Sequence, residues 1–502
     1  MATETRASTV PHWINGEETA ATGSRQGNVT NAATGMTVRT VPFANAADVD
    51  LAVKAATAAY PGWRATTPLR RARILMKFRD LIEQHMGEFA AMISEEHGKT
   101  VPDAAGSTQR GLEVVEFATG IPHLLKGEHA EDVGTGIDSH TLKQPLGVCA
   151  GITPFNFPIM VPLWMIPVAL ACGNTFILKP SEKDPSASML LARLLKEAGL
   201  PNGVLNVVHG DKEAVDAILD HPDIAGVSFV GSTPIAKYIY ETASRNGKRV
   251  QALGGAKNHA VVLPDADLEG AAEALIGAGY GSAGERCMAI SAVVAVGEAG
   301  DELVAKIRDK AKRLKVGPGD KDGMEMGPLV TKEHRDRVKG YVDIGEQEGA
   351  DIVVDGRGLQ VKGYEGGHFL GPTLFDNVTT DMKIYKDEIF GPVLLVIRAE
   401  NYSEAIDIVN QNTYGNGTAV FTQSGQAARR FENEIQVGMV GINVPIPVPM
   451  AFFSFGGWKS SLFGDLHVHG MEGVKFYTRT KVITTRWPER PESASLAMPT
   501  MK

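Results

Sequence analysis

The stretch that decides the fold runs from Val148 to Glu182 and reads VCAGITPFNFPIMVPLWMIPVALACGNTFILKPSE. Its pattern predicts a buried strand at Val148–Thr153, an apolar helix at Pro158–Cys172 and a second strand at Thr175–Lys179. The segment from Pro145 to Leu178 carries no charge, and an uncharged apolar run longer than about 18 residues can span a bilayer. Several prolines interrupt this run, however, so a buried strand–helix–strand unit explains it better than a membrane span.

Short apolar strands continue to alternate with helices after this unit. Helices are predicted at Ser186–Ala198 and Pro234–Ser244, and strands at Val204–Val208 and Gly226–Val230. This alternation is typical of a parallel, doubly wound sheet with helices on both faces. From Ala260 onward the alternation of strands and helices begins again. The sequence therefore predicts an α/β protein in which a doubly wound lobe is followed by a second α/β lobe.

Composition narrows the possible classes of function. The net charge is −9, and the chain has neither a basic block nor a stretch in which basic and aromatic residues alternate. Nucleic acid is therefore not an expected partner, because its binding relies on neutralised phosphates. Three cysteines fit a reducing compartment better than a cross-linked secreted scaffold, and the N-terminal MATETRASTVPHWING resembles no secretory or transit leader. We expect a cytoplasmic protein without membrane contact.

Three short stretches are candidates for binding a dinucleotide. The literal G-x-G-x-x-G at Gly279–Gly284 follows a helical run, which excludes it as a pyrophosphate loop and predicts close packing near Cys287 instead. Gly231-Ser232-Thr233 follows the strand VSFV and opens a helix, where amides and hydroxyls can hold a phosphate. Lys179 and Glu182 follow another predicted strand, at the edge where open α/β sheets bind ligands. A carboxylate there favours NAD over NADP, because it would repel a 2′-phosphate; a solvated Lys–Glu pair is the alternative.

A cysteine and an asparagine are the candidate catalytic pair. A lone cysteine such as Cys287 is most often a small buried apolar residue. Asn156 favours a catalytic role for Cys287 instead, because a primary amide among prolines and aromatics just after a strand can donate a hydrogen bond together with a backbone N–H. Together these donors can stabilise an oxyanion that forms when a thiolate adds to a carbonyl.

Six motifs, taken in order from about Trp13 to Trp487, resemble those of the aldehyde dehydrogenase superfamily. They are TPFNFP, KPSE, FVGST, the Gly-Gly turn of ALGGAKN, GERC and DEIFGP. The resemblance implies an aldehyde dehydrogenase-like fold, with Cys287 as the nucleophile and Asn156 as the oxyanion donor. The residues implied for binding NAD are Phe155, then Lys179, Glu182 and Ser232 at the adenosine and phosphates, and Glu388 and Phe390 at the nicotinamide ribose and ring.

The same resemblance implies a domain organisation. Residues 1–123 and 146–255 would form the NAD-binding domain, 256–455 the catalytic domain, 124–145 and 456–490 the oligomerisation and bridging segments with a small hairpin, and 491–502 a flexible tail. The chain would then assemble as a homodimer or a homotetramer.

One departure from the superfamily pattern bears on the reaction. Hydrolytic members carry Glu-Leu-Gly-Gly-Lys, whose glutamate activates the deacylating water, whereas this chain reads QALGGAK from Gln251 to Lys257. Ala252 is assigned to the glutamate position, and alanine can neither take nor give a proton. A thioacyl group on Cys287 would then need a strongly nucleophilic acceptor, and the thiol of coenzyme A qualifies.

Further segments resemble the CoA-acylating branch that acts on methylmalonate semialdehyde: QRGLEVVEFA, GGAKNH, GSAGERCMA and residues 441–465. The substrate of that branch carries a carboxylate, and Arg110 and Arg286 are assigned to it because a guanidinium suits bidentate carboxylate binding. For Arg110 a surface pair with Glu113 is the alternative, and for Arg286 a structural role.

The expected reaction is the NAD-dependent oxidation and decarboxylation of methylmalonate semialdehyde to propionyl-CoA. Malonate semialdehyde would give acetyl-CoA, since one methylene discriminates by only about 1–3 kcal/mol. Two alternatives stay open: a hydrolytic aldehyde dehydrogenase that uses another base, and a catalytically silent relative kept as a binding protein.

Glu285, two residues before the thiol, is interpreted as structural. No metal is expected at His467 and His469, because no third ligand lies nearby.

Overall fold

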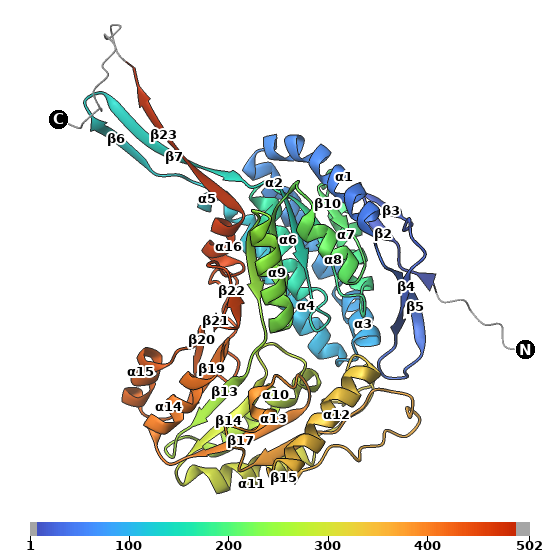
Figure 1. Ribbon diagram of the computed structural model, residues 1–502, viewed down its shortest axis with the longest axis vertical. Coiled ribbons are helices and arrows are strands. Elements are labelled where there is room, and N and C mark those ends of the chain that lie inside the picture. Colours follow the sequence, from blue (N-terminus) through green and yellow to red (C-terminus); the bar gives the residue numbers. More distant parts are fainter. Residues whose placement is uncertain (1–7, 488–502) are drawn as a thin grey trace, which may run out of the picture.

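A computed structural model describes residues 8–487 as two α/β lobes and a protruding arm (Figure 1). The arm is an antiparallel sheet in the order β23 (Thr478–Arg486), β7 (Ile137–Pro145) and β6 (His129–Gly134). The two segments assigned to oligomerisation thus pair with each other, although they lie far apart in the sequence. The expected tail at 491–502 lies outside the described residues.

The first lobe is built on an eight-stranded sheet, and β8 follows the predicted strand closely. The order is β22 (Leu462–Phe463), β12 (Arg249–Leu253), β11 (Ile224–Val230), β8 (Val148–Ile152), β9 (Thr175–Lys179), β10 (Leu205–Val207), β2 (His12–Ile14) and β3 (Glu17–Thr19). The strands from β12 to β10 are parallel. Since β9 and β10 extend to one side of β8 and β11 and β12 to the other, the winding direction reverses beside β8. Open α/β sheets bind ligands at such a reversal.

Helices cover both faces of this sheet, as the alternation of strands and helices predicted. Their bounds are α1 (Ala46–Ala65), α2 (Pro68–Gln84), α3 (Met86–Glu96), α4 (Val101–Thr119), α5 (Ile121–Leu124), α6 (Met160–Ala171), α7 (Ser186–Glu197), α8 (Lys212–Asp220) and α9 (Thr233–Arg245). Side chains of α1, α8 and α9 form one apolar cluster with one face of the sheet. Those of α4, α6 and α7 form a larger cluster with the opposite face.

Helix α6 accounts for the long uncharged run. Every one of its residues is buried, as expected of a helix that is apolar all round and lies inside a protein. Two of its last carbonyls are satisfied by other helices: Trp63 Nε1 donates to Leu170 at 3.2 Å and Arg71 Nε to Ala171 at 3.0 Å. Among residues 8–487, no helix is both long enough and apolar enough to cross a membrane.

The second lobe has its own seven-stranded sheet. The order is β15 (Asp351–Val354), β16 (Thr373–Asp376), β17 (Val393–Ala399), β14 (Ile290–Val296), β13 (Asn258–Val262), β19 (Gly417–Phe421) and β20 (Met439–Ile442), all parallel except β15. The accompanying helices are α10 (Leu268–Tyr280), α11 (Ala299–Ala311), α12 (Lys332–Gln347), α13 (Lys383–Lys386), α14 (Tyr402–Gln411) and α15 (Gly425–Glu434). Figure 1 shows α12 on the side of this lobe that faces α3.

Candidate active site

The carboxyl edge of the first sheet gathers the predicted cofactor residues. Asn156 follows β8, Lys179 is the last residue of β9, and Ser232 caps α9 directly after β11. These three strands are neighbours and parallel, so their ends lie at one edge. Ser232 is exposed and its hydroxyl makes no capping bond with α9, which leaves it available to a phosphate at the helix N-terminus.

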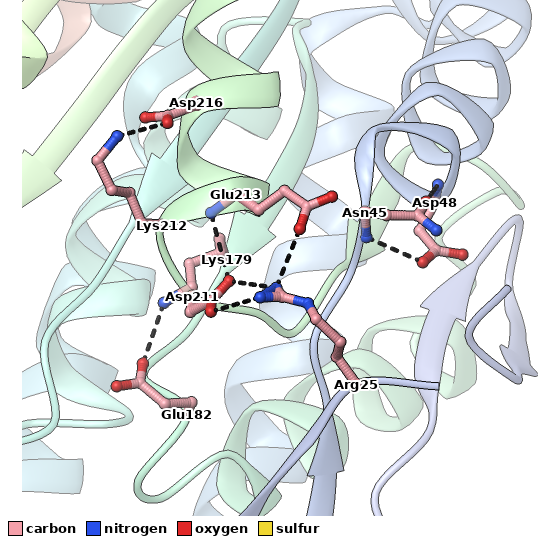
Figure 2. A network of polar contacts seen from close by, with 9 residues as sticks. All are labelled: Arg25, Asn45, Asp48, Lys179, Glu182, Asp211, Lys212, Glu213 and Asp216. Atoms are coloured by element: carbon pink, nitrogen blue, oxygen red, sulfur yellow. Dashed lines mark hydrogen bonds and ion pairs between the residues drawn. The ribbon is translucent and has the colours of Figure 1, made fainter. Parts of the chain in front are cut away.

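Ion pairs form beside this edge of the sheet (Figure 2). Lys179 Nζ lies 3.3 Å from a Glu182 carboxylate oxygen, so the pair considered as an alternative does form. Asp211, the N-cap of α8, accepts from both terminal nitrogens of Arg25 at 2.7 and 3.0 Å. This bidentate contact fixes the N-terminal segment against the loop that follows β10.

Cys287 is the one cysteine of the three that is not fully buried. It follows a short 3-10 turn at Gly281–Gly284, which confirms that the glycine motif there succeeds a helix, α10. Its carbonyl accepts from the side-chain amides of Asn258 at 2.9 Å and Asn416 at 3.0 Å. These two asparagines fix the peptide that carries the nucleophile. Sequence reasoning assigned a role to neither, although Asn258 is the last residue of the ALGGAKN motif.

Cys287 lines a pocket whose other walls include Ala256, Arg286, Glu388 and Phe390. Burial, and after it the nearby Glu388 carboxyl, raise the pKa of Cys287 to about 12. Burial likewise raises the pKa of Glu388 to about 7, although its carboxylate accepts from the Ala256 N–H at 2.8 Å. Burial and the Glu388 carboxyl therefore both oppose ionisation of the thiol.

An aromatic cluster connects the two lobes beside this pocket. The Phe155 ring lies 5.9 Å from those of Phe390, His334 and His97. Phe390 has a left-handed backbone, with φ of +61°, and its carbonyl accepts from His334 Nε2 at 2.7 Å. Such a conformation is costly for a non-glycine residue, so α12 helps to hold the DEIFGP turn in place. His334 carried no signal in the sequence.

The two arginines assigned to the substrate carboxylate both have protein partners. Arg110, on α4, contacts Glu113 and donates to the carbonyl of Pro449 at 2.8 Å. The surface pair considered as an alternative therefore forms, and the same side chain ties α4 to the loop after β20. Arg286 donates to Asp103 at 2.8 Å. Both guanidinium groups stay partly exposed, at 31% and 22% of the side chain, so neither is closed to a ligand.

The assignment of Ala252 to the glutamate position is wrong by one residue. Successive side chains of a strand point to opposite faces, and Ala252 lies in the cluster with Phe229 and Ala236 on the α1, α8 and α9 face. Leu253 lies in the cluster on the other face, against which Cys287 packs. Matching the lysine of Glu-Leu-Gly-Gly-Lys to Lys257 also places Leu253 at the glutamate. The chemical conclusion survives, because leucine cannot transfer a proton either.

Two α/β lobes, with a partly exposed cysteine in a pocket beside the carboxyl edge of a doubly wound sheet, define a two-lobed α/β enzyme with a candidate cysteine nucleophile. The chain belongs to the aldehyde dehydrogenase family, whose model matches residues 19–483. It is similar to the malonate-semialdehyde dehydrogenase of Pseudomonas aeruginosa, with 58% identity over 98% of this chain and 100% of that one. It is also similar to the mitochondrial methylmalonate-semialdehyde dehydrogenase (acylating) of Arabidopsis thaliana, with 50% identity over 98% of this chain and 81% of the relative. A Sinorhizobium meliloti 1021 protein solved in complex with NAD has a TM-score of 0.96 and 57% identity, covering 97% of this chain and 99% of its own.

Proposed function

We propose that this chain is an NAD-dependent, CoA-acylating semialdehyde dehydrogenase. Its substrates would be methylmalonate semialdehyde, which gives propionyl-CoA, and malonate semialdehyde, which gives acetyl-CoA. The names of the relatives support the substrate class. The observation that carries the acylating chemistry is Leu253, which occupies the thiol's face of the sheet where a hydrolytic enzyme needs a carboxylate.

The protein groups would act in a fixed order. The Cys287 thiolate adds to the aldehyde carbon, and the Asn156 amide with a backbone N–H holds the oxyanion. NAD, when bound, accepts the hydride that leaves this carbon, so that a thioacyl group remains on Cys287. NAD would be held by Phe155, Lys179, Glu182, Ser232, Glu388 and Phe390. The free hydroxyl of Ser232 and the aromatic cluster at Phe155 fit such a ligand. The thiolate of CoA then adds to the thioacyl carbon and displaces the Cys287 thiolate, so that the acyl group leaves as a CoA thioester and Cys287 is regenerated.

The substrate carboxylate would be bound by Arg110 and Arg286. Arg286 adjoins the nucleophile and lines its pocket, and Arg110 remains partly exposed. The carboxylate is lost most easily after oxidation, because the thioester carbonyl then accepts the electrons of the breaking carbon–carbon bond. We therefore place decarboxylation between hydride transfer and acyl transfer to CoA.

Assembly and location belong to the same proposal. The arm formed by β6, β7 and β23 carries exposed apolar residues, among them Leu142 and Val482 at 41% and 66% exposure. An arm of this kind would lie against a second copy in a cytoplasmic homodimer or homotetramer. The domains would be those given by the sequence, with the first sheet binding NAD and the second carrying the nucleophile.

The decisive experiment measures NADH formation from methylmalonate semialdehyde with and without CoA, and identifies the products. We expect a single turnover per thiol without CoA, and sustained turnover to propionyl-CoA with it. Equal steady-state rates in both conditions, with free acid as the product, would contradict the acylating assignment and support the hydrolytic alternative. Absence of NADH with any aldehyde would support the silent relative.

A carboxylate at position 253 should create the missing hydrolysis. In Leu253→Glu, we expect release of free acid without CoA to rise about tenfold or more, within the range of general base catalysis. The matched variant Ala252→Glu places the same group on the far face of the sheet, at a position with no exposure. Ala252→Glu should leave the rate of hydrolysis unchanged and should lower the melting temperature. Hydrolysis by Ala252→Glu alone would restore the original assignment.

A further inference from the structure

We propose that Lys99 is a positioning residue for the reaction: it anchors the peptide of Asn156 and supplies a buried positive charge beneath the thiol and the oxyanion site. This inference rests on the proposed roles of Cys287 and Asn156. Lys99 lies outside the residues to which the reaction has so far been assigned, between α3 and α4.

The loop that carries Lys99 is held rigidly between the lobes. A Cβ at Gly319 would lie 2.3 Å from the Lys99 carbonyl oxygen, and one at Gly327 would lie 1.9 Å from that of Gly98. The backbone of the second lobe therefore approaches this loop as closely as glycine allows. Thr100 caps α4 directly afterwards. This packing fixes the backbone of Lys99 and so restricts the directions in which its side chain can point.

That direction is toward the candidate oxyanion site. Lys99 is 1% exposed, and its Nζ donates to the main-chain carbonyl of Asn156 at 2.7 Å. The same ammonium lies 4.1 Å from the centre of the Phe157 ring, a favourable cation–π distance. The residues on either side of the Asn156 carbonyl are thus fixed by one cation, and the amide that would meet the oxyanion starts from an anchored backbone.

The charges around Lys99 leave a net positive field. Burial raises the pKa values of Glu285 and Asp184 well above their usual range, which favours their neutral forms. Against the opposing effect of burial, Lys99 and then Arg286 hold the pKa of Asp103 below its usual value. Two cations, Lys99 and Arg286, therefore face one carboxylate, Asp103. Glu388 acts on the thiol from the other side and opposes them.

This field bears on the thiol itself. The charge on Lys99 lowers the pKa of Cys287, against the larger effects of burial and Glu388 that raise it. Burial lowers the pKa of Lys99 to about 8, and an amine is charged below its pKa. The assistance to the thiolate is therefore present at pH 7 and is lost as the pH rises through about 8.

The test is the pH dependence with which iodoacetamide alkylates Cys287, in the full-length enzyme without cofactors. Cys149 and Cys172 are fully buried, and Cys287→Ala gives the background. In Lys99→Met we expect severalfold slower alkylation at pH 7, because the thiolate is the nucleophile and the charge that favours it is gone. Well above pH 8 the variant and the wild type should react alike, because Lys99 has then lost its charge in the wild type. The kcat should fall with little change in KM for the aldehyde.

Two further variants separate this role from a structural one. Lys248→Met removes another buried lysine that binds backbone carbonyls, at the opposite edge of the sheet, where its Nζ donates to Ile224 at 3.0 Å. It should leave the alkylation profile unchanged. Asp103→Asn keeps Lys99 but removes the carboxylate that holds the pKa of its ammonium up. The pH at which the assistance to the thiolate is lost should therefore fall below that of the wild type.

Slower alkylation of Lys99→Met at pH 7, together with an earlier loss of reactivity advantage in Asp103→Asn as the pH rises, supports the proposal. If Lys99→Met alkylates like the wild type at pH 7, Lys99 has no role in the charge of the site. Alkylation requires no substrate, so this result is independent of whether the wild type acylates CoA.

Discussion

Replacing Cys287 with alanine should abolish NADH formation from every aldehyde, with a loss in kcat of at least about 10⁴-fold, as for other nucleophile deletions. The reason is that no covalent adduct can form, so no carbon is prepared to release a hydride. The loss in kcat is measured from steady-state NADH absorbance, with a burst measurement at high enzyme concentration. Binding of NAD should persist, because the proposed cofactor residues lie on the first sheet and the DEIFGP turn.

Cys172→Ala is the matched control. Cys172 is 1% exposed at the end of α6, in the interior of the first lobe, and its thiol pKa is raised to about 12 by burial. This variant should keep its turnover within about twofold and lose only the stability of a small core truncation, about 1 kcal/mol. Loss of turnover in Cys172→Ala but not in Cys287→Ala would contradict the assignment of the nucleophile.

The first lobe could be predicted from local pattern because its decisive unit is local. The strands Val148–Thr153 and Thr175–Lys179 and the helix between them follow from apolar runs whose lengths match their elements. The pattern from Leu69 to His97 predicts one long helix, but the structure has two, α2 and α3, because the backbone leaves helical geometry at His85, with φ of −99° and ψ of 12°. Gly87, two residues later, is the one local sign of the break, and a single glycine inside a helical pattern is often tolerated.

The site was harder to predict where it depends on which face a strand shows. QALGGAK contains two adjacent glycines, so the glutamate position can be placed on Ala252 or on Leu253 by sliding one residue. A slip of one residue moves a side chain to the opposite face of a sheet, and only the packing of β12 decides between the two. Asn258 and Asn416 were missed for a different reason. Asn258 begins β13 and Asn416 directly precedes β19, and no sequence spacing predicts that both would reach the Cys287 carbonyl.

Replacing Asn156 with alanine should reduce kcat by about 10²–10³-fold, the usual cost of removing one oxyanion donor. The residue follows β8 and is 3% exposed. Its main chain stays bound to Lys99 whatever the side chain is. The substitution therefore removes the amide donor and leaves the peptide in place, so KM should change little while the barrier to hydride transfer rises.

A deuterated aldehyde distinguishes this loss from a structural one. Without the amide the oxyanion forms less readily and hydride departure becomes slower, so the isotope effect on kcat should grow toward its intrinsic value. Alkylation of Cys287 should stay near the wild-type rate, because the amide acts on the substrate oxygen and not on the thiol. If Asn156→Ala lost alkylation and turnover together, the asparagine would be a support of the thiol loop. Asn156→Asp sharpens the distinction, since a carboxylate of the same shape repels the oxyanion and should be slower than alanine.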